Sequence, residues 1–335
     1  MSSRQYSLES LLLGITPHHQ KLIIEKGFVP YTDHQLANQL THQSTKKSVE
    51  IIVRVGGRPI HFLKRCLDSI AHQTYQNIGI VIVKYQEIAG LENLLKQYTD
   101  RLFIKVIETQ FSGFRSTQLM AGINAVTSEY FGILDDDDLI HPNHVFLLVS
   151  LLESSSHLGV AYSGSIRVWE SDKSDRIQKH KRFDKQDNQH NPYYETAKLH
   201  YFEDFSLKKI LRFKNFISSN SFIAKRSLLC DEFNFDPQLK VGEDFFVLLN
   251  LCRRANFVFS YEATCEFYWR QSKRDNSSFD SDWVWEESVN RIKYLFEGKS
   301  FANSLYLVRS SKFWQLKVLW IKLKRLALAF WDRVR

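Results

Sequence analysis

The stretch Tyr130–Asp138 (YFGILDDDD) decides the fold, because a short apolar run ends there in four consecutive aspartates. An apolar run of this length between polar residues is typical of a buried strand. Similar runs stand at Val49–Val55 (VEIIVRV), Ile78–Val83 (IGIVIV) and Phe103–Ile107. Their many β-branched residues favour strands over helices. The four aspartates therefore follow the fourth strand of a predicted series.

Helical periodicity separates these strands. The apolar residues after Pro59 recur at helical spacing, and proline is favoured at the start of a helix. The first predicted helix contains Ile60, Leu63, Leu67 and Ile70. Three further helices are predicted at Leu91–Tyr98, Gly113–Ala125 and Val145–Leu152. Strands that alternate with helices predict a Rossmann-like α/β fold, with a mostly parallel central sheet flanked by helices. Ligands bind such sheets beyond the carboxyl ends of the strands, where the aspartates stand.

The second half of the chain predicts fewer, less regular elements. Strands are expected at Gly159–Val168, Ser221–Ala224 and Phe257–Tyr261, with a helix at Glu243–Arg254 and helices from 283 onward. The very polar residues 170–200 predict a long loop. We divide the chain into an N-terminal helical and linker extension (1–48), an α/β domain (49–275) and C-terminal helices (276–335).

Composition excludes some classes of protein. With 335 residues, 44% hydrophobic and 24% charged, the chain is an ordinary folded protein. The net charge of +8 favours anionic partners. The chain lacks a basic block interleaved with aromatic residues, the pattern that would favour nucleic acid, so we expect no nucleic-acid partner. Cys66, Cys230, Cys252 and Cys265 form no CxxC pair, and the N-terminus does not resemble a signal peptide. We expect reduced cysteines and a cytoplasmic protein.

The four aspartates favour a metal site. Carboxylates this close repel one another unless positive charge lies among them. A Mg²⁺ ion takes one or two carboxylates together with phosphate oxygens, and can neutralise charge on a phosphate leaving group. Two other interpretations stay open: a solvated acidic loop that caps the next helix, and a phosphatase of the haloacid-dehalogenase type. That phosphatase pattern normally has Thr or Val where Leu139 stands.

Three blocks resemble, in order, the family 2 glycosyltransferases with a GT-A fold, over roughly residues 49–275. The first block follows the first strand and comprises Arg58-Pro59, Leu63, Cys66-Leu67, Ser69-Ile70 and Gln73-Thr74-Tyr75. The second comprises Ala121-Gly122-Ile123, Ala125, Ser128-Glu129-Tyr130, Leu134-Asp135-Asp136-Asp137-Asp138 and Pro142. The third comprises Phe235-Asp236, Leu239 and Gly242-Glu243-Asp244.

The resemblance implies an inverting glycosyltransferase that uses a nucleotide-sugar donor, an acceptor hydroxyl and Mg²⁺ or Mn²⁺. Asp135, Asp137 and Asp138 match the family's DxD metal motif, and Asp136 beside them is expected to bind the donor. Asp244, with Glu243, matches the position of the general base. Tyr268, Arg270 and Ser272 match loosely a strand end near the phosphates. Arg54 and Arg115 are candidates to bind the leaving diphosphate.

The chain also departs from the family pattern. Arg54-Val55-Gly56-Gly57 stands where Thr-Tyr-Asn is usual, and Val83-Lys84-Tyr85-Gln86-Glu87 stands where an Asp-Asp-Gly-Ser element usually contacts the base. A nucleotidyltransferase or a non-catalytic, membrane-peripheral binding subunit of the same fold are therefore kept as alternatives. His141 is weighed as a further metal ligand, although a loop histidine is more often a turn residue.

Residues 311–335 predict a basic amphipathic helix. One face would carry apolar side chains from Phe313 to Phe330, while Lys317, Lys322, Lys324 and Arg325 lie off that face. Such a helix suits an anionic membrane surface, or the protein's own core or a partner subunit. We expect peripheral association with the inner face of the plasma membrane and a glycan or lipid-linked acceptor, as in polysaccharide biosynthesis of the cell envelope.

Overall fold

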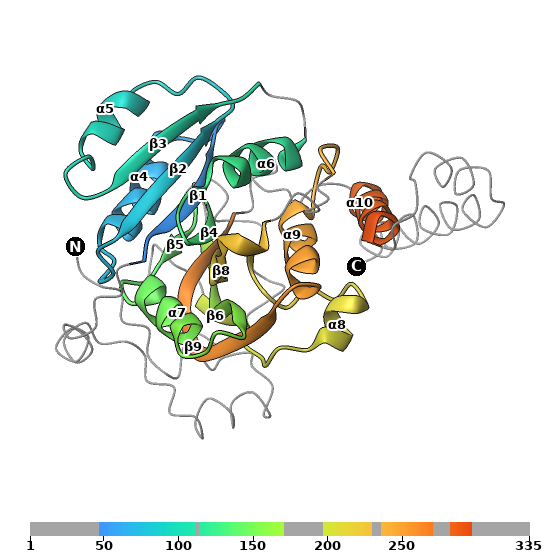
Figure 1. The fold of residues 1–335 in the computed structure, drawn as a ribbon. Coiled ribbons are helices and arrows are strands. Elements are labelled where there is room, and N and C mark those ends of the chain that lie inside the picture. Colours follow the sequence, from blue (N-terminus) through green and yellow to red (C-terminus); the bar gives the residue numbers. More distant parts are fainter. Residues whose placement is uncertain (1–46, 111–113, 171–196, 230–235, 271–281, 297–335) are drawn as a thin grey trace, which may run out of the picture.

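The computed structural model describes residues 47–110, 114–170, 197–229, 236–270 and 282–296. These residues form one nine-stranded sheet of order β3-β2-β1-β4-β8-β6-β9-β5, in which β7 pairs with β6 outside this path (Figure 1). The strands are β1 (Val49–Val55), β2 (Ile78–Lys84), β3 (Phe103–Glu108), β4 (Tyr130–Asp135), β5 (Leu139–Ile140), β6 (Leu158–Glu170), β7 (Ala197–Tyr201), β8 (Phe222–Lys225) and β9 (Asn256–Arg270).

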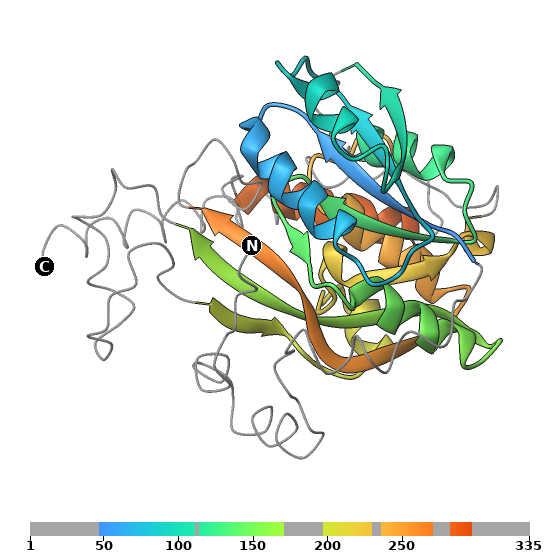
Figure 2. The ribbon, with the colours of Figure 1, turned by 90° about the vertical axis from the view of Figure 1, so that its left-hand side faces the viewer.

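Most strands run in one direction. β1 lies between β2 and β4 and is parallel to both, and β2 is parallel to β3. β8 runs antiparallel to its neighbours β4 and β6, so that β6 regains the first direction and β9 is parallel to it. The mostly parallel α/β sheet predicted from the sequence is therefore confirmed. Figure 2 shows the long strands β6 and β9 curving side by side away from the parallel half.

Helices cover both faces of the sheet. They are α4 (Ile60–Ala71), α5 (Leu91–Lys96), α6 (Arg115–Ala125), α7 (His144–Glu153), α8 (Leu207–Leu211), α9 (Glu243–Cys252) and α10 (Asp282–Phe296). β1 is buried on both sides because its alternate residues face two cores. Ile51 and Val53 lie in the core formed with α4, α5 and α7, whereas Ile52 lies in the core formed with α6, α9 and α10.

The elements of the second half differ from the sequence predictions. β9 extends to Arg270 instead of ending at Tyr261, because it pairs with β6 along nearly its whole length. Residues 197–201 form β7 on the edge of β6, although the prediction placed 197–200 in a loop. The two-residue strand β5 follows the aspartates and pairs with β9. In each case pairing with a distant strand decides the structure, which local composition does not reveal.

Helix α9 begins at a glycine with positive φ. Gly242 has a φ of 76°, a value that L-residues adopt rarely, and directly precedes Glu243. A Cβ atom on Gly242 would lie 3.2 Å from Ile292 of α10. Arg291 of α10 also forms an ion pair with Asp236, in the loop that leads to α9. This loop, and with it the start of α9, is therefore held against α10.

Some sequence predictions concern residues that the structure does not describe. Residues 1–46 and 297–335 contain most of the N-terminal extension and the whole basic amphipathic helix, so the domain division and that helix remain predictions. Of the helices that are described, none combines the length and apolar character needed to cross a bilayer.

Candidate active site

The candidate site lies where β1 and β4 end side by side. From β1 the chain adds β2 and β3 on one side and then crosses to add β4 on the other side. Such a topological switch point between two parallel strands is the usual ligand site of an open α/β sheet. The register aligns Arg54, near the end of β1, with Asp135, the last residue of β4. Asp136 to Asp138 form the turn from β4 into β5. The aspartates thus lie where the sequence predicted them.

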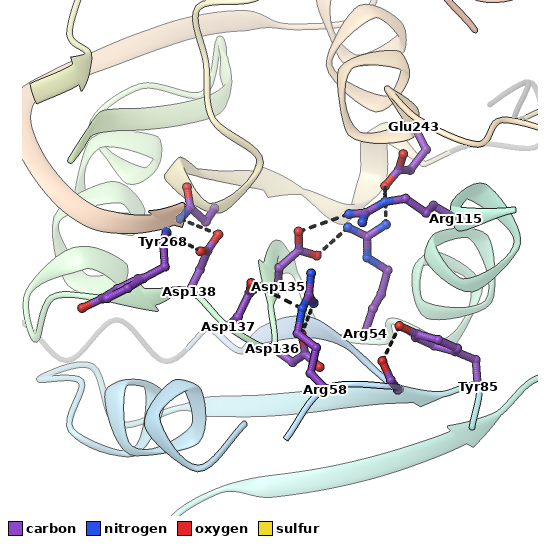
Figure 3. A network of polar contacts seen from close by, with 12 residues as sticks. Arg54, Arg58, Tyr85, Arg115, Asp135, Asp136, Asp137, Asp138, Glu243 and Tyr268 are labelled. Atoms are coloured by element: carbon purple, nitrogen blue, oxygen red, sulfur yellow. Dashed lines mark hydrogen bonds and ion pairs between the residues drawn. The ribbon is translucent and has the colours of Figure 1, made fainter. Parts of the chain in front are cut away.

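Two arginines and two carboxylates form a closed ring of ion pairs, here called the ion ring. Arg54 donates to one carboxylate oxygen of Asp135 at 2.5 Å and also to Oε1 of Glu243. Arg115 donates to the other oxygen of Asp135 at 3.3 Å and to the same Oε1 of Glu243 at 2.8 Å (Figure 3). The ion ring joins β1, β4, α6 and α9, and its two positive and two negative charges balance.

Burial and the arginines act in opposite directions on the ion ring. Burial on its own would raise the pKa of Asp135, but Arg54, Arg115 and Arg58 outweigh it and lower that pKa below the usual range. The pKa of Glu243 is lowered in the same way, by Arg115 and Arg54 against the effect of burial. Both carboxylates are therefore ionised at neutral pH, and each is already paired with two guanidinium groups.

Arg58 neutralises the middle of the acidic turn. Its guanidinium forms an ion pair with Asp136 and lies 3.4 Å from the carboxylate of Asp137. Burial raises the pKa of Asp136 to about 7, and although Arg58 opposes this, Asp137 and Asp135 add to it. Arg58 alone therefore does not return the pKa of Asp136 to the ordinary value of an aspartate.

Asp138 is held by hydrogen bonds from neutral groups. One oxygen accepts the backbone N–H of Tyr268 at 2.9 Å, and the other accepts the side-chain amide of Asn220 at 3.2 Å. Burial raises the pKa of Asp138 well above the usual value, and the charges of Asp137 and Asp135 raise it further. The ionised carboxylate of Asp138 thus accepts two hydrogen bonds from neutral groups, and a bound cation would supply the positive charge that it lacks.

The donor set fits a hard divalent cation. Asp135, Asp137 and Asp138 each offer a carboxylate oxygen, and these oxygens lie within 4.8 Å of one another. Carboxylate oxygens are the ligands that Mg²⁺ and Mn²⁺ favour. Even with Arg65, which donates to the backbone oxygen of Asp137, the carboxylates outnumber the arginines. The carboxylates are Asp135, Asp136, Asp137, Asp138, Glu243 and Asp244, against Arg54, Arg58, Arg65 and Arg115.

Asp244 lies next to the ion ring, as the second residue of α9. Its side chain is partly exposed, in contrast to Glu243, which is 2% exposed. Burial and the neighbouring charge of Glu243 raise the pKa of Asp244 to about 6, against the backbone N–H of Phe245, Arg54 and Arg115. A carboxylate with a pKa in this range is suited to accept a proton near neutral pH.

The remaining predicted site residues fall into two groups. Tyr268 is buried, stacks under the guanidinium of Arg65 at 3.8 Å and donates its hydroxyl to Glu266 at 2.6 Å. Its backbone rather than its side chain supports the acidic turn. Arg270 ends β9, but its side chain and the whole of Ser272 lie outside the described residues. His141 bonds with Glu266 at 3.1 Å and is not in the group of potential metal ligands.

Sequence reasoning missed three residues that support the site: Arg58, Arg65 and Asn220. Arg58 had a signal, because it stands in the first block of the resemblance, beside Pro59, but the resemblance assigned it no role at the site. Arg65 follows Arg58 in the chain, lies in α4 and donates to the backbone oxygen of Asp137. Asn220 is 82 residues from Asp138 in the chain, and no local pattern connects the two.

At the end of β2, Tyr85 and Lys84 form contacts that fix the residues after this strand. Tyr85 donates its hydroxyl to the backbone oxygen of Gly56 at 2.7 Å. A Cβ atom on Gly56 would lie 2.6 Å from the Tyr85 ring, so only glycine allows this approach. Lys84 forms ion pairs of 2.8 Å with both Glu87 and Glu108. The stretch that stands in place of the family's Asp-Asp-Gly-Ser element is thus bonded through Tyr85 to the turn after β1.

A nine-stranded α/β sheet with an acidic turn after β4 defines a protein of the GT-A class. A solved structure with this fold is that of S. aureus TarS 1–349 in complex with UDP-GlcNAc. The two are 17% identical, with a TM-score of 0.52, and the match covers 73% of this chain and 65% of the other. At this identity the likeness concerns the fold, and it confirms the predicted GT-A-type architecture.

The family follows from the sequence comparison. The family model described as "Glycosyl transferase family 2" matches residues 48–213. Residues 48–213 therefore match glycosyl transferase family 2, which confirms the resemblance drawn from the first two blocks. The match begins one residue before β1 and ends before α9, so that it includes the acidic turn but not Glu243 and Asp244.

Curated relatives match over shorter segments. Glycosyltransferase GlyA of Streptococcus pneumoniae is 32% identical over 89 residues, which are 25% of this chain and 12% of GlyA. The uncharacterized glycosyltransferase RT0329 of Rickettsia typhi is 29% identical over 92 residues, or 28% of each chain. The chain thus aligns with well under two thirds of the length of these relatives.

Proposed function

We propose that this protein is an inverting glycosyltransferase that transfers a sugar from a nucleotide-sugar donor to an acceptor hydroxyl. One observation carries the proposal: the ion ring ties the start of α9, and hence Asp244, to the acidic end of β4. A candidate base and a candidate metal site are thereby held at one edge of the sheet, although they are more than 100 residues apart in the chain. The family 2 domain supports the reaction class.

Asp137 and Asp138, with Asp135, are the residues proposed to hold Mg²⁺ or Mn²⁺. When bound, such a cation would supply positive charge opposite the diphosphate of the donor. The raised pKa values of Asp136 and Asp138 support this role, because burial and the neighbouring aspartates disfavour their charged forms, which a bound cation would stabilise. Both oxygens of Asp135 accept bonds from positively charged arginines, whereas those of Asp138 accept bonds from neutral groups, so Asp137 and Asp138 are the proposed principal ligands.

Asp244 is proposed as the general base. Its carboxylate would take the proton of the acceptor hydroxyl as that oxygen attacks the anomeric carbon, and the bond to the diphosphate breaks on the opposite side. A single displacement of this kind inverts the configuration and requires no protein nucleophile. Glu243 was predicted as a catalytic residue together with Asp244. Because Glu243 is buried and bonded to Arg54 and Arg115, we propose Asp244 alone for proton transfer.

A nucleotide sugar and a glycan or lipid-linked acceptor are the proposed substrates. The structure of S. aureus TarS with UDP-GlcNAc supports a nucleotide-sugar donor for this fold. The names of the relatives support glycosyl transfer, and we propose that it serves polysaccharide biosynthesis. We propose further that residues 311–335 bind an anionic membrane surface. Deleting them should abolish sedimentation with vesicles containing anionic lipid, and a full-length chain that does not sediment would refute this part.

The test is a panel of nucleotide sugars, each incubated with Mn²⁺ and scored for release of the nucleoside diphosphate and for thermal shift. A matching donor should raise the melting temperature by mass action and be turned over only with the metal. Asp137→Ala should lose metal-dependent donor binding. Unchanged donor affinity in that variant would remove the metal assignment, and turnover of nucleoside triphosphates instead would indicate a nucleotidyltransferase. Donor binding without turnover with any acceptor would indicate a binding subunit.

A further inference from the structure

The ion ring is more than a neutral buried cluster, because of where its four members stand in the chain. Arg115 is the first residue of α6, and Glu243 is the first residue of α9. Arg54 precedes the last residue of β1, and Asp135 is the last residue of β4. The ion ring therefore fixes the ends of four elements to one another, and Asp244 is the residue directly after one of its members.

Each arginine contacts both carboxylates of the ion ring. Arg54 uses one terminal nitrogen for Asp135 and the other for Glu243, and Arg115 uses Nη2 for Asp135 and Nε for Glu243. A guanidinium group can bridge two carboxylates in this way because its donors form a planar fork, whereas an ammonium group is a point charge. Arg54 is 6% exposed, so solvent screens these contacts little.

We propose that Arg54, together with Arg115, is a positioning residue that holds Asp244 in place through Glu243 and sets its readiness to accept a proton. This inference rests on the proposed function of Asp244. It replaces the predicted contact of Arg54 and Arg115 with the donor, because their guanidinium groups are committed to Asp135 and Glu243.

The electrostatic consequence has a definite sign. The negative charge of Glu243 raises the pKa of Asp244, while Arg54 and Arg115 lower it. Removing one arginine should therefore raise that pKa, and removing the charge of Glu243 should lower it. The other groups on neighbouring elements do not change between these variants. They are Tyr201 of β7, Lys209 of the neighbouring α8, which is paired with Glu203, and Arg291 of α10, which is paired with Asp236.

The experiment compares Arg54→Met, Glu243→Gln and the double variant, each of which replaces a charge by a neutral side chain of similar size. The readout is the acidic limb of kcat/KM against pH for transfer. We expect the limb to move up by about one pH unit in Arg54→Met and down by a similar amount in Glu243→Gln. The double variant should return close to the limb of the unmodified protein, with a reduced kcat.

A conservative variant separates charge from geometry. Arg54→Lys keeps the positive charge but cannot bridge two carboxylates, so its limb should stay in place while kcat falls about tenfold or more. If Arg54→Met and Glu243→Gln move the limb in the same direction, or not at all, the proposal is wrong. If Arg54→Met does not fold, Glu243→Gln and the double variant still decide between these outcomes.

A direct titration distinguishes failure of this proposal from failure of the proposed function. The pKa of Asp244 can be followed by NMR of protein labelled with ¹³C in the aspartate carboxyl groups, with Asp244→Asn identifying the signal. This measurement needs no transferase activity. Opposite shifts without any sugar transfer would retain the positioning role and refute the glycosyltransferase, whereas transfer without the shifts would do the reverse.

Discussion

At the scale of single residues, Asp244 differs from an ordinary carboxylate in the first turn of a helix. Glu92 has the same position in α5, as the second residue of the helix, and it is exposed. A carboxylate there is favoured by the helix dipole whether or not it has a function. Asp244 is distinguished by partial burial, by Glu243 and by two nearby arginines, which together set its pKa.

We predict that Asp244→Asn retains donor binding and loses sugar transfer, because an amide cannot accept the proton of the acceptor. The expected fall in kcat is about 100-fold or more, as for loss of a general base. The measurements are donor affinity by calorimetry and the initial rate of transfer. Glu92→Gln is the matched control and should change neither. Transfer at the full rate in Asp244→Asn would rule out the base role.

The pH dependence of transfer should report the same residue. Asp244 must be unprotonated to act, and its pKa is raised to about 6, so the unprotonated fraction falls as the pH falls below that value. We predict that kcat/KM is level above about pH 7 and falls about tenfold per pH unit well below pH 6. Asp244→Asn should lack this limb in its residual rate. A limb centred near the ordinary aspartate value of about 4 would contradict the prediction.

At the scale of elements, helix α6 must approach the sheet closely in order to present Arg115. Gly122 faces β1 and β2, and a Cβ atom there would lie 2.4 Å from Cγ2 of Ile52 and 3.0 Å from Cγ2 of Val83. Both neighbours are fully buried, β-branched residues with little freedom to move. The distance between α6 and the sheet therefore depends on this glycine.

We predict that Gly122→Ala destabilises the protein, although alanine is the better helix former by about 1 kcal/mol. Overpacking of a buried contact costs about 1–3 kcal/mol and should win, so that the melting temperature falls by several degrees. Asn124→Ala, on the exposed side of the same helix, is the control and should leave the melting temperature equal or slightly higher. An unchanged or raised melting temperature for Gly122→Ala would show that α6 can move outward without cost.

The sequence predicted those elements whose local residue pattern is distinctive. It did not predict the strands that form only because they pair with a distant strand. The apolar runs of β1, β2 and β4 read as strands because both their faces are buried, and the acidic turn was placed correctly for the same reason. β7 and the second half of β9 carry polar residues and exist as strands because β6 lies between them. The ion ring could not be predicted, since Arg54 and Glu243 are 189 residues apart.

At the scale of the whole molecule, the acidic site should couple metal binding to proton release. Burial and the neighbouring aspartates raise the pKa of Asp138, so without a cation it keeps its proton to higher pH than an ordinary aspartate. A bound cation requires the ionised form and must displace that proton. Its apparent affinity, and the stabilisation that it provides, should therefore increase as the pH rises.

We predict that Mn²⁺ raises the melting temperature more at pH 8 than at pH 5.5, with a difference of at least several degrees at the same concentration of the ion. Thermal unfolding followed by calorimetry at both pH values measures this. Glu92→Gln should behave like the unmodified protein, and Asp137→Ala should show little rise at either pH. An equal rise at both pH values in the unmodified protein would mean that the ion binds elsewhere.

The ion ring also determines how the chain can be divided. The family match ends at residue 213, whereas Glu243 lies 30 positions further on, at the start of α9. A fragment cut at the end of that match would lack Glu243, so that the buried guanidinium of Arg54 and the partly exposed one of Arg115 would be left to share the carboxylate of Asp135. Removing one partner of a buried ion pair typically costs about 3–5 kcal/mol, a large part of the stability of a domain. Recombinant versions of this protein should therefore include α9 and also β9, which pairs with β6 and ends at Arg270, and shorter ones should be recovered as insoluble material.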